Sequence, residues 1–259
     1  MGSGGAAQGL RQASPFMIIS ASQPYFCPFP GFFYKAYLSD LLVILDEVQF
    51  PQSTTWISRN RFKNAQGTLW LTIPVWKKGL GLQNISQVSI CYEGRWPRKH
   101  PESLKSAYGN APYFPEHFVF LNEMLAARFA RLVDLNLAII RYLMPCLKVD
   151  TPLVRLSHLG VEGRGTQLLV KICQALGAST FLTPAAAEKH LDATLFKEAG
   201  VELRSFKYEA PIYPQLWGDF LPDLSALDLL YNCGPKARDI IIGRQPVFLR
   251  ESPEGLDHD

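Results

Sequence analysis

Polar residues that can bind or activate a ligand directly follow two short apolar segments near the start of the chain. Residues 17–22 run into Gln23, and residues 41–45 run into Asp46. The Gln23 amide can both donate and accept hydrogen bonds. A carboxylate such as Asp46 can act as a general base or bind a ribose hydroxyl, an amine or a metal. The structural alternative for Asp46 is a helix cap or an ion pair.

The loop after the first apolar segment reads SASQPYFCPFPGFF and contains three prolines, Pro24, Pro28 and Pro30. Each proline fixes the backbone angle φ and removes a backbone donor, so the loop is predicted to be stiff. A stiff loop loses little conformational entropy when a ligand binds, and it holds Gln23 and Tyr25 in defined places. The alternative is a proline-rich turn that only redirects the chain.

A second polar group lies in the segment DEVQFPQSTTWISRNRFK, where Gln49 precedes Asn60, Arg61 and Lys63. Arginine forms bidentate hydrogen bonds with phosphate or carboxylate groups, and lysine supplies a point charge. The cluster lies between aromatic residues, so it favours a planar or phosphorylated ligand.

The same region is strongly basic. Residues 51–100 hold eight Lys and Arg residues and a single acid, Glu93. Such a field attracts phosphate-bearing ligands, although a solvated basic face explains the charge equally well. Contact with RNA is a third interpretation. His100 lies in this stretch and is the histidine that we consider as a second candidate base.

Composition excludes several classes of protein. The chain has 259 residues with 47% hydrophobic and 19% charged residues, which is typical of a globular protein. It has no apolar run of the roughly 20 residues needed to span a membrane, and residues 1–16 lack the apolar core of a signal peptide. Five scattered cysteines without a C-x-x-C pair argue against disulfides and zinc. We therefore expect a cytoplasmic protein without a metal site, membrane insertion or DNA binding.

The pattern of apolar segments and glycines predicts alternating strands and helices. Helices followed by Gly177 and Gly200 each lead into a β-rich segment, which indicates an α/β fold. We expect strands at residues 17–22, 41–45, 68–75, 84–90, 153–159, 179–183 and 201–208, with 68–75 and 84–90 forming a hairpin. We expect helices after residue 31 and at 96–108, 114–147 (broken near Ala127), 166–176, 185–199, 223–231 and 236–242.

These elements predict an α/β fold with a mostly parallel sheet flanked by helices, and a β-hairpin and helical insertion in the middle of the chain. We expect a disordered extension at residues 1–16, a single domain at 17–244 and a flexible acidic tail at 245–259. In open parallel sheets ligands bind outside the carboxyl ends of the strands. Residues 22–25, 46–49 and 183–184 lie at such ends.

Four segments in this order resemble the WbqC-like proteins: QPYFCPFPGFFYKAYLSDLLVILDEVQF, WISRNRFKNAQGTLWLTIPV, LGVEG and YPQLWGDFLPDLSALDLLYNCGP. The resemblance covers residues 17–243. It implies a role in bacterial clusters for O-antigen and other surface polysaccharides, with glycine or aminoacyl transfer to an amino-sugar. The positions that match the family's strongest motifs are Gln23, Pro24, Gly31, Asp46, Gln49, Asn60, Arg61, Lys63, Glu162, Tyr213, Gln215, Asn232 and Gly234.

Two departures from the family pattern limit this inference. Ser22 replaces the His or Met that often precedes Gln-Pro, and LTPAAAEKHLD replaces a glycine-rich SGxGGxxYL segment. Loss of the glycines argues against a backbone cradle for phosphate in that loop. The start of the chain is also similar to nucleotidyltransferase-like enzymes, but without their H-x-G-H motif.

We therefore expect an acyl or aminoacyl transferase of surface-glycan biosynthesis that acts on a nucleotide-linked amino-sugar. In this hypothesis Arg61 and Lys63 bind the diphosphate, Gln23 and Asn60 orient the sugar or base, and Asp46 or His100 acts as the base. A charged tRNA or a carrier protein is a candidate acyl donor, and no cofactor is identified. The alternatives are a non-catalytic module that binds a nucleotide-sugar or carrier, and a nucleotidyltransferase-like enzyme.

Overall fold

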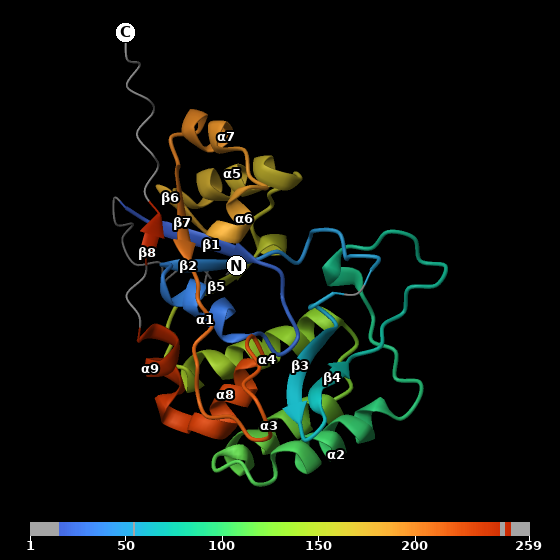
Figure 1. Ribbon diagram of the computed structural model, residues 1–259. Helices are drawn as coiled ribbons and strands as arrows, with labels where there is room; N and C mark the ends of the chain where they lie inside the picture. The colour runs from blue at the N-terminus through green and yellow to red at the C-terminus, as the bar shows by residue number, and fades with distance from the viewer. Residues whose placement is uncertain (1–15, 54, 244–246, 250–259) are drawn as a thin grey trace, which may run out of the picture.

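The computed structural model describes residues 16–53, 55–243 and 247–249. Its centre is a six-stranded sheet with the strand order β5–β2–β1–β6–β7–β8 (Figure 1). The first five of these strands are parallel, and β8 pairs antiparallel with β7. The strands are β1 (Ile18–Ser22), β2 (Leu41–Ile44), β5 (Leu153–Arg155), β6 (Thr180–Pro184), β7 (Glu202–Lys207) and β8 (Val247–Leu249).

The strand order reverses between β1 and β6. From β1 the chain moves outward to β2 and β5, and it then crosses back to place β6 and β7 on the other side of β1. The carboxyl ends of β1 and β6 therefore lead into loops that diverge. This topological switch point is where doubly wound sheets bind their ligands.

Both faces of the sheet are buried. Leu41 and Val43 belong to one apolar cluster, whereas Leu42 and Ile44 belong to the other, because successive side chains in a strand point to opposite faces. The continuous apolar pattern of this strand follows from burial on both sides. The strand LLVI could not lie at the surface of an open sheet.

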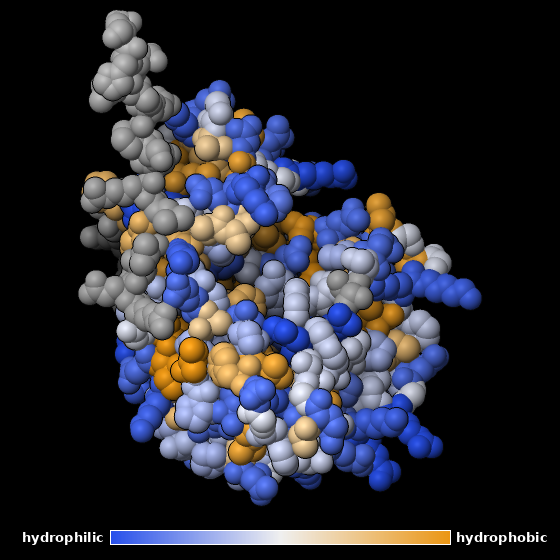
Figure 2. Space-filling view, viewed as in Figure 1, coloured by the Kyte–Doolittle hydropathy of each residue, from blue (hydrophilic) through white to orange (hydrophobic). Residues whose placement is uncertain are grey.

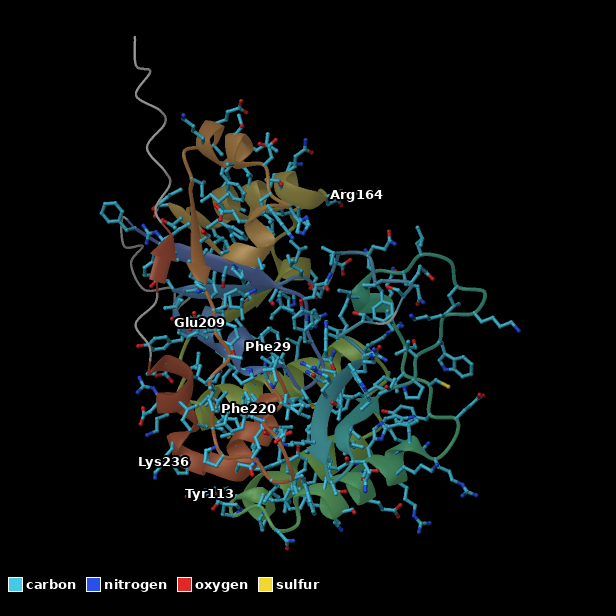
Figure 3. All side chains as sticks on the ribbon, in the orientation of Figure 1. Phe29, Tyr113, Arg164, Glu209, Phe220 and Lys236 are labelled. Carbon is cyan, nitrogen blue, oxygen red and sulfur yellow. The ribbon has the colours of Figure 1, made fainter. Side chains whose placement is uncertain are left out.

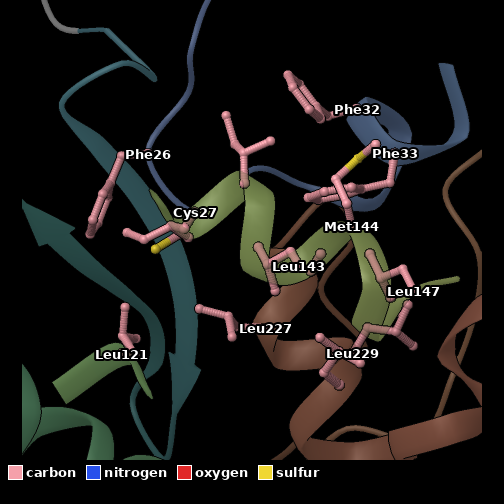
Figure 4. Close-up of a cluster of buried hydrophobic side chains, with 14 of the residues drawn as sticks. Phe26, Cys27, Phe32, Phe33, Leu121, Leu143, Met144, Leu147, Leu227 and Leu229 are labelled. Carbon is pink, nitrogen blue, oxygen red and sulfur yellow. The ribbon is translucent and has the colours of Figure 1, made fainter. Parts of the chain in front are cut away.

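Helices form a layer on each face (Figure 1). The upper layer contains α5 (Gly165–Leu176), α6 (Ala185–Glu188) and α7 (Ala193–Glu198). The lower layer contains α1 (Pro30–Tyr37), α4 (Leu132–Cys146), α8 (Ala226–Cys233) and α9 (Ala237–Ile242), with α2 (Trp96–Tyr108) and α3 (Phe114–Ala126) beyond them. Side chains from the proline loop, α1, α4 and α8 meet in the core of this lower part (Figure 4).

The antiparallel hairpin consists of β3 (Arg59–Asn64) and β4 (Gly67–Thr72). Our prediction that residues 84–90 pair with 68–75 as a hairpin is wrong. The two segments meet only at their ends: Val75 and Ile90 form an isolated bridge, flanked by backbone bonds from Trp76 to Ser89 and from Cys91 to Pro74. Ile85–Gln87 form a 3₁₀-helix that begins at an Asn84 capping box. The turn between β3 and β4 ends at Gly67, the first residue of β4. Its φ of +106° is a conformation that favours glycine.

Most other predicted elements are confirmed, with four differences. The strand β3 was not predicted. The strand predicted at residues 153–159 ends at Arg155, and Leu156–His158 form a 3₁₀-helix. The helix predicted at residues 185–199 is divided, because the Asp192 side chain accepts a hydrogen bond from the Thr194 backbone and starts a new helix. Residues 247–249, which we expected in a flexible tail, form the edge strand β8. The extension at residues 1–15 and the tail at 250–259 lie outside the described residues.

Within the described part of the chain, no helix has the length and apolar character to cross a membrane.

Candidate functional site

A crevice of about 420 Å³ opens at the switch point, at the carboxyl ends of β1 and β6. Figure 2 shows an indentation of the surface between the α5–α7 layer and the body below it. We call this cavity the switch-point crevice. Its lining residues are Ala21, Ser22, Gln23, Tyr25, Phe29, Gly31, Phe32, Lys35, Leu45, Leu169, Phe181, Thr183, Pro184, Ala187 and Leu191. A mostly apolar wall with a few polar groups is typical of small-molecule sites.

The proline loop forms one wall of the crevice and is fixed from behind. The Asn136 side chain donates to the carbonyl of Pro24 at 2.7 Å, and the Asn60 side chain donates to the carbonyls of Phe26 and Cys27 at 3.0 and 2.7 Å. These buried amides satisfy carbonyls that the irregular loop leaves without partners. The loop is therefore held rigidly while Gln23 and Tyr25 face the crevice.

Gly31 permits close packing beside the crevice. A side-chain carbon at this position would lie 2.5 Å from the Phe29 ring and 2.8 Å from the Tyr208 ring. Phe29 and Tyr208 pack edge to face with their centroids 6.1 Å apart. Figure 3 shows Phe29 on the segment that runs from the sheet towards the lower helices. Only glycine allows this aromatic wall to approach the start of α1.

Lys35 is the charged group of the crevice. It projects from α1, and only 8% of the residue is exposed. Its ammonium group donates to the carbonyl oxygen of Ala21 at 2.7 Å and to the hydroxyl of Ser22 at 3.1 Å, both at the end of β1. No Asp or Glu is found among the described residues that line the crevice, and no ion pair of Lys35 is present in the described part of the chain.

Burial without a carboxylate changes the chemistry of this lysine. Desolvation disfavours the charged form and lowers the pKa of Lys35 to about 8. When Lys35 is neutral, its two amine hydrogens can be donated to the Ala21 carbonyl and the Ser22 hydroxyl. The nitrogen lone pair is then free to accept a proton or to attack an electrophile. A lysine of this kind can act as a general base near neutral pH.

The opposite wall comes from β6 and α6. Thr183 is 5% exposed, and it supplies a hydroxyl at the end of β6 beside Ala187 and Leu191. This is the LTPAAAEKHLD segment, and its alanine and leucine side chains give the wall an apolar surface. Thr183, Ser22 and Gln23 thus line the crevice with neutral polar groups, and Ser22 contacts Lys35 directly.

Asp46 lies at the end of β2 but is engaged on all sides. It is fully buried, and it accepts hydrogen bonds from Arg155 at 2.6 Å and from the backbone and hydroxyl of Ser157 at 3.0 and 2.7 Å. Burial raises the pKa of Asp46, but the bonds from Ser157 and the charge of Arg155 outweigh it and hold the pKa below its usual value. These contacts tie β2 to β5, so they favour a structural role over the predicted role as a base.

Arg61 and Lys63 bind the segment before α8 instead of pointing into the crevice. Arg61 donates to the carbonyls of Pro222 and Asp223 at 3.2 and 3.1 Å. Lys63 donates to the Gln215 side chain at 3.1 Å and to the carbonyl of Asp219 at 2.6 Å. A diphosphate ligand would have to replace these contacts, so their predicted role is not favoured by the structure.

A buried carboxylate organises the same region. Asp228 accepts hydrogen bonds from the hydroxyls of Tyr108 and Tyr213 at 2.6 and 2.7 Å. Burial raises the pKa of Asp228, although the two tyrosines and Lys63 oppose this effect. Asn232 donates to the backbone of Asp228 and accepts from Leu216. Tyr213, Gln215 and Asn232 thus form one network with Lys63.

The remaining predicted site residues do not line the crevice. His100 bonds to the carbonyl of Thr72 at 2.7 Å, and burial lowers its pKa. Gln49 is exposed and pairs with Asn84 in an isolated bridge. Glu162 is exposed in the loop before α5, near Arg164, which Figure 3 places at the outer end of that helix. Of the predicted site residues, the crevice brings together Gln23 and Tyr25, with Pro24 between them.

Lys35 is not among the residues predicted from the sequence. The available signal was a helix, PGFFYKAY, whose other residues are apolar or aromatic and which therefore has to be buried nearly all round. A single lysine in such a helix has to place its charge inside the protein. Nothing in the sequence shows that the charge meets the end of β1.

The described residues contain no group of three His, Cys, Asp or Glu side chains that could hold a metal ion. All five cysteines are free thiols.

Comparison with known proteins gives two matches. The model of the WbqC-like protein family matches residues 23–240. The uncharacterized protein Rv1507c of Mycobacterium tuberculosis (strain ATCC 25618 / H37Rv) is 30% identical over 226 residues, which cover 86% of this chain and 96% of that protein. No solved structure matches the chain significantly.

Proposed function

This chain belongs to the WbqC-like protein family, and from that premise we propose that it is an acyl or aminoacyl transferase with its active site in the switch-point crevice. The proposed acceptor is a nucleotide-linked amino-sugar in bacterial surface-glycan biosynthesis. The observation that carries the proposal is Lys35, a buried amine that pairs with no carboxylate of the described residues and lies where such sheets bind ligands.

Lys35 acts as the general base in this reaction. The acceptor amine attacks the acyl carbonyl, and a new carbon–nitrogen bond forms while the carbonyl becomes an oxyanion. The proton of the attacking amine passes to the neutral amine of Lys35. When the oxyanion collapses, the bond to the donor's leaving group breaks, and Lys35 returns the proton to that group.

The other polar residues of the crevice suit the remaining steps. Gln23, Ser22 and Thr183 can donate hydrogen bonds to the oxyanion or to sugar hydroxyls. Tyr25 and Phe29 provide aromatic faces for a sugar ring or a base. The rigid proline loop keeps these groups in place before the substrate arrives, which lowers the cost of binding.

Binding at the crevice can be tested by filling it. We expect UDP-glucosamine to raise the melting temperature of the wild type, because a ligand that binds only the folded state stabilises it. Ala187→Phe places a ring in the crevice wall, and it should weaken binding at least about tenfold by removing the space for a sugar. The matched control is Ala193→Phe on the exposed side of α7. Equal affinity in both variants would place the ligand elsewhere.

The chemical step is tested separately with Lys35→Met. We expect this variant to bind the acceptor and to lose acyl transfer by about 10²–10⁴-fold, the usual contribution of a general base. Wild-type transfer should rise with pH through about 8 as Lys35 loses its proton. The donors to be tested are aminoacyl-tRNAs, acyl-carrier proteins and acyl-coenzyme A. If the acceptor binds in the crevice but none of these donors gives a product, the chain is a binding module and not a transferase.

A further inference from the structure

The loop formed by residues 76–83 exposes an unusual group of apolar side chains. Trp76 is 44% exposed, Leu80 52% and Leu82 70%. They lie in the sequence WKKGLGLQ, where Lys77 and Lys78 stand between the tryptophan and the two leucines. Scattered exposed leucines are normal, but three large apolar residues within one short loop indicate an interaction surface. We call residues 76–83 the WKKGLGL loop.

The base of this loop is fixed and its tip projects. The Gln83 side chain donates to the carbonyl of Trp76 at 3.2 Å, and the Gln83 carbonyl accepts from the backbone of Phe50 at 2.8 Å. At the tip, side-chain carbons added to Gly79 or Gly81 would meet no atom within 4 Å. Figure 1 shows the segment between β4 and α2 as loops along the right-hand side of the molecule. The two glycines of the tip therefore face open space, and hydrogen bonds hold the base of the loop.

The loop itself is positively charged, because its two charged residues are Lys77 and Lys78. Glu47 lies at its base, where it accepts a hydrogen bond from the Asn84 side chain at 2.9 Å. Lys78 is exposed at the tip, and Lys77 donates to the carbonyls of Pro51 and Gln52. Among the described residues, neither lysine forms an ion pair. The right-hand edge of the molecule in Figure 2 accordingly combines hydrophobic and strongly hydrophilic side chains.

Shape and charge together favour a lipid surface over a protein. A stable protein interface buries about 800 Å² on each partner with good shape complementarity. Three apolar side chains in one short loop do not supply such an area. A bilayer accepts a protrusion of any shape: leucines enter the acyl boundary, tryptophan sits at the headgroup level, and lysines pair with anionic headgroups.

We propose that the WKKGLGL loop docks this protein on the surface of membranes that contain anionic lipids, with Leu80 and Leu82 inserted and Lys78 at the headgroups. The contact is peripheral and requires no spanning helix. It does not depend on the function proposed for the crevice, and the vesicle experiment is done without any substrate.

The test is co-sedimentation of the full chain with vesicles of phosphatidylcholine containing about one third phosphatidylglycerol. We expect the wild type to sediment with these vesicles and not with pure phosphatidylcholine, and to be released by salt. The double variant Leu80→Ser/Leu82→Ser should bind at least about tenfold more weakly, because it removes the apolar groups that enter the bilayer. Lys78→Ala should weaken binding about fivefold, since each lysine near an anionic surface adds attraction.

Ile212→Ser is the matched control, because Ile212 is 78% exposed in a different loop. It should bind vesicles like the wild type, and all variants should keep the wild-type melting temperature because the changed side chains are exposed. Absence of wild-type binding, or equal binding by the double leucine variant, would overturn the proposal. So would a dimer in sedimentation velocity that dissociates in the double variant, since the loop would then contact a second copy.

Discussion

Replacing Lys35 with methionine tests the physical basis of the candidate site. Methionine has similar length and no charge, so it fills the same space without the desolvated ammonium group. Burial lowers the pKa of Lys35 from 10.5 to about 8. At about 1.4 kcal/mol per pH unit, keeping this lysine charged in the folded chain costs about 3 kcal/mol.

The sign of the pH dependence follows from this pKa. Below pH 8 Lys35 is protonated in both the folded and the unfolded chain. The folded wild type is then destabilised by the full free energy of burying the charged ammonium group. Between about pH 8 and 10.5 the folded chain has lost the proton while the unfolded chain still binds it, so wild-type stability rises with pH. Above that range both states are neutral and the cost is gone. Lys35→Met has no such proton at any pH.

The variant also loses two hydrogen bonds, to the Ala21 carbonyl and the Ser22 hydroxyl. Each contributes about 1 kcal/mol, and this loss does not change with pH. We therefore expect Lys35→Met to be as stable as the wild type or about 1–2 kcal/mol more stable at pH 7. It should lose about 2–3 kcal/mol relative to the wild type by pH 10.

Urea unfolding of both proteins at several pH values between 7 and 10 measures this difference, because other titrating groups contribute equally to both. Lys99→Met, on the exposed side of α2, is the control for the substitution itself. A free-energy difference between Lys35→Met and the wild type that stays constant from pH 7 to 10 would refute the reasoning. The lysine would then be solvated, and it would not be the base that the proposed reaction needs.

Three further predictions concern the framework of the site. Asp46→Asn breaks the buried pair with Arg155 and should cost about 3–5 kcal/mol in urea unfolding at pH 7; because its pKa is depressed, the wild type's advantage should be present above pH 3.8 and disappear as the pH falls further. Gly31→Ala forces a methyl group to within 2.5 Å of a ring and should cost about 1–3 kcal/mol, measured as a lower melting temperature; an unchanged value would show that the wall can move. Tyr213→Phe removes a 2.7 Å bond to buried Asp228 and should cost about 1–3 kcal/mol in urea unfolding, whereas an equally stable variant would show that Tyr108 alone satisfies the carboxylate.

Local signals predicted the helices well. The helix at residues 96–108 agrees with α2 at both ends, because Pro97 starts it and its apolar positions have helical spacing. Gly177 ends α5 in the left-handed conformation that glycine favours. The strand β3 was missed because its sequence, RNRFKN, is polar. Its buried Asn60 and Lys63 are satisfied by groups that are distant in sequence, so neither periodicity nor composition marks it as a strand.

The sequence indicated a loop that borders the crevice, but it did not indicate Lys35. The apolar segment before Gln23 and the three prolines correctly indicated a rigid loop at the end of a parallel strand, next to the crevice. The charged residues predicted for the site differ from the one that lines the crevice. Asp46, Arg61 and Lys63 are the chemically attractive groups in the sequence, and the structure engages all three in internal contacts.

The sequence by itself determined the alternation of strands and helices, the caps of several helices and the stiffness of the proline loop, because these depend on residues close together along the chain. The tertiary structure decided which polar groups are already satisfied. Arg155, 109 positions away in the sequence, forms an ion pair with Asp46. Gln215, 152 positions away, accepts a hydrogen bond from Lys63. No carboxylate of the described residues pairs with Lys35, and a lysine's pKa depends on the charges and solvent that folding places around it.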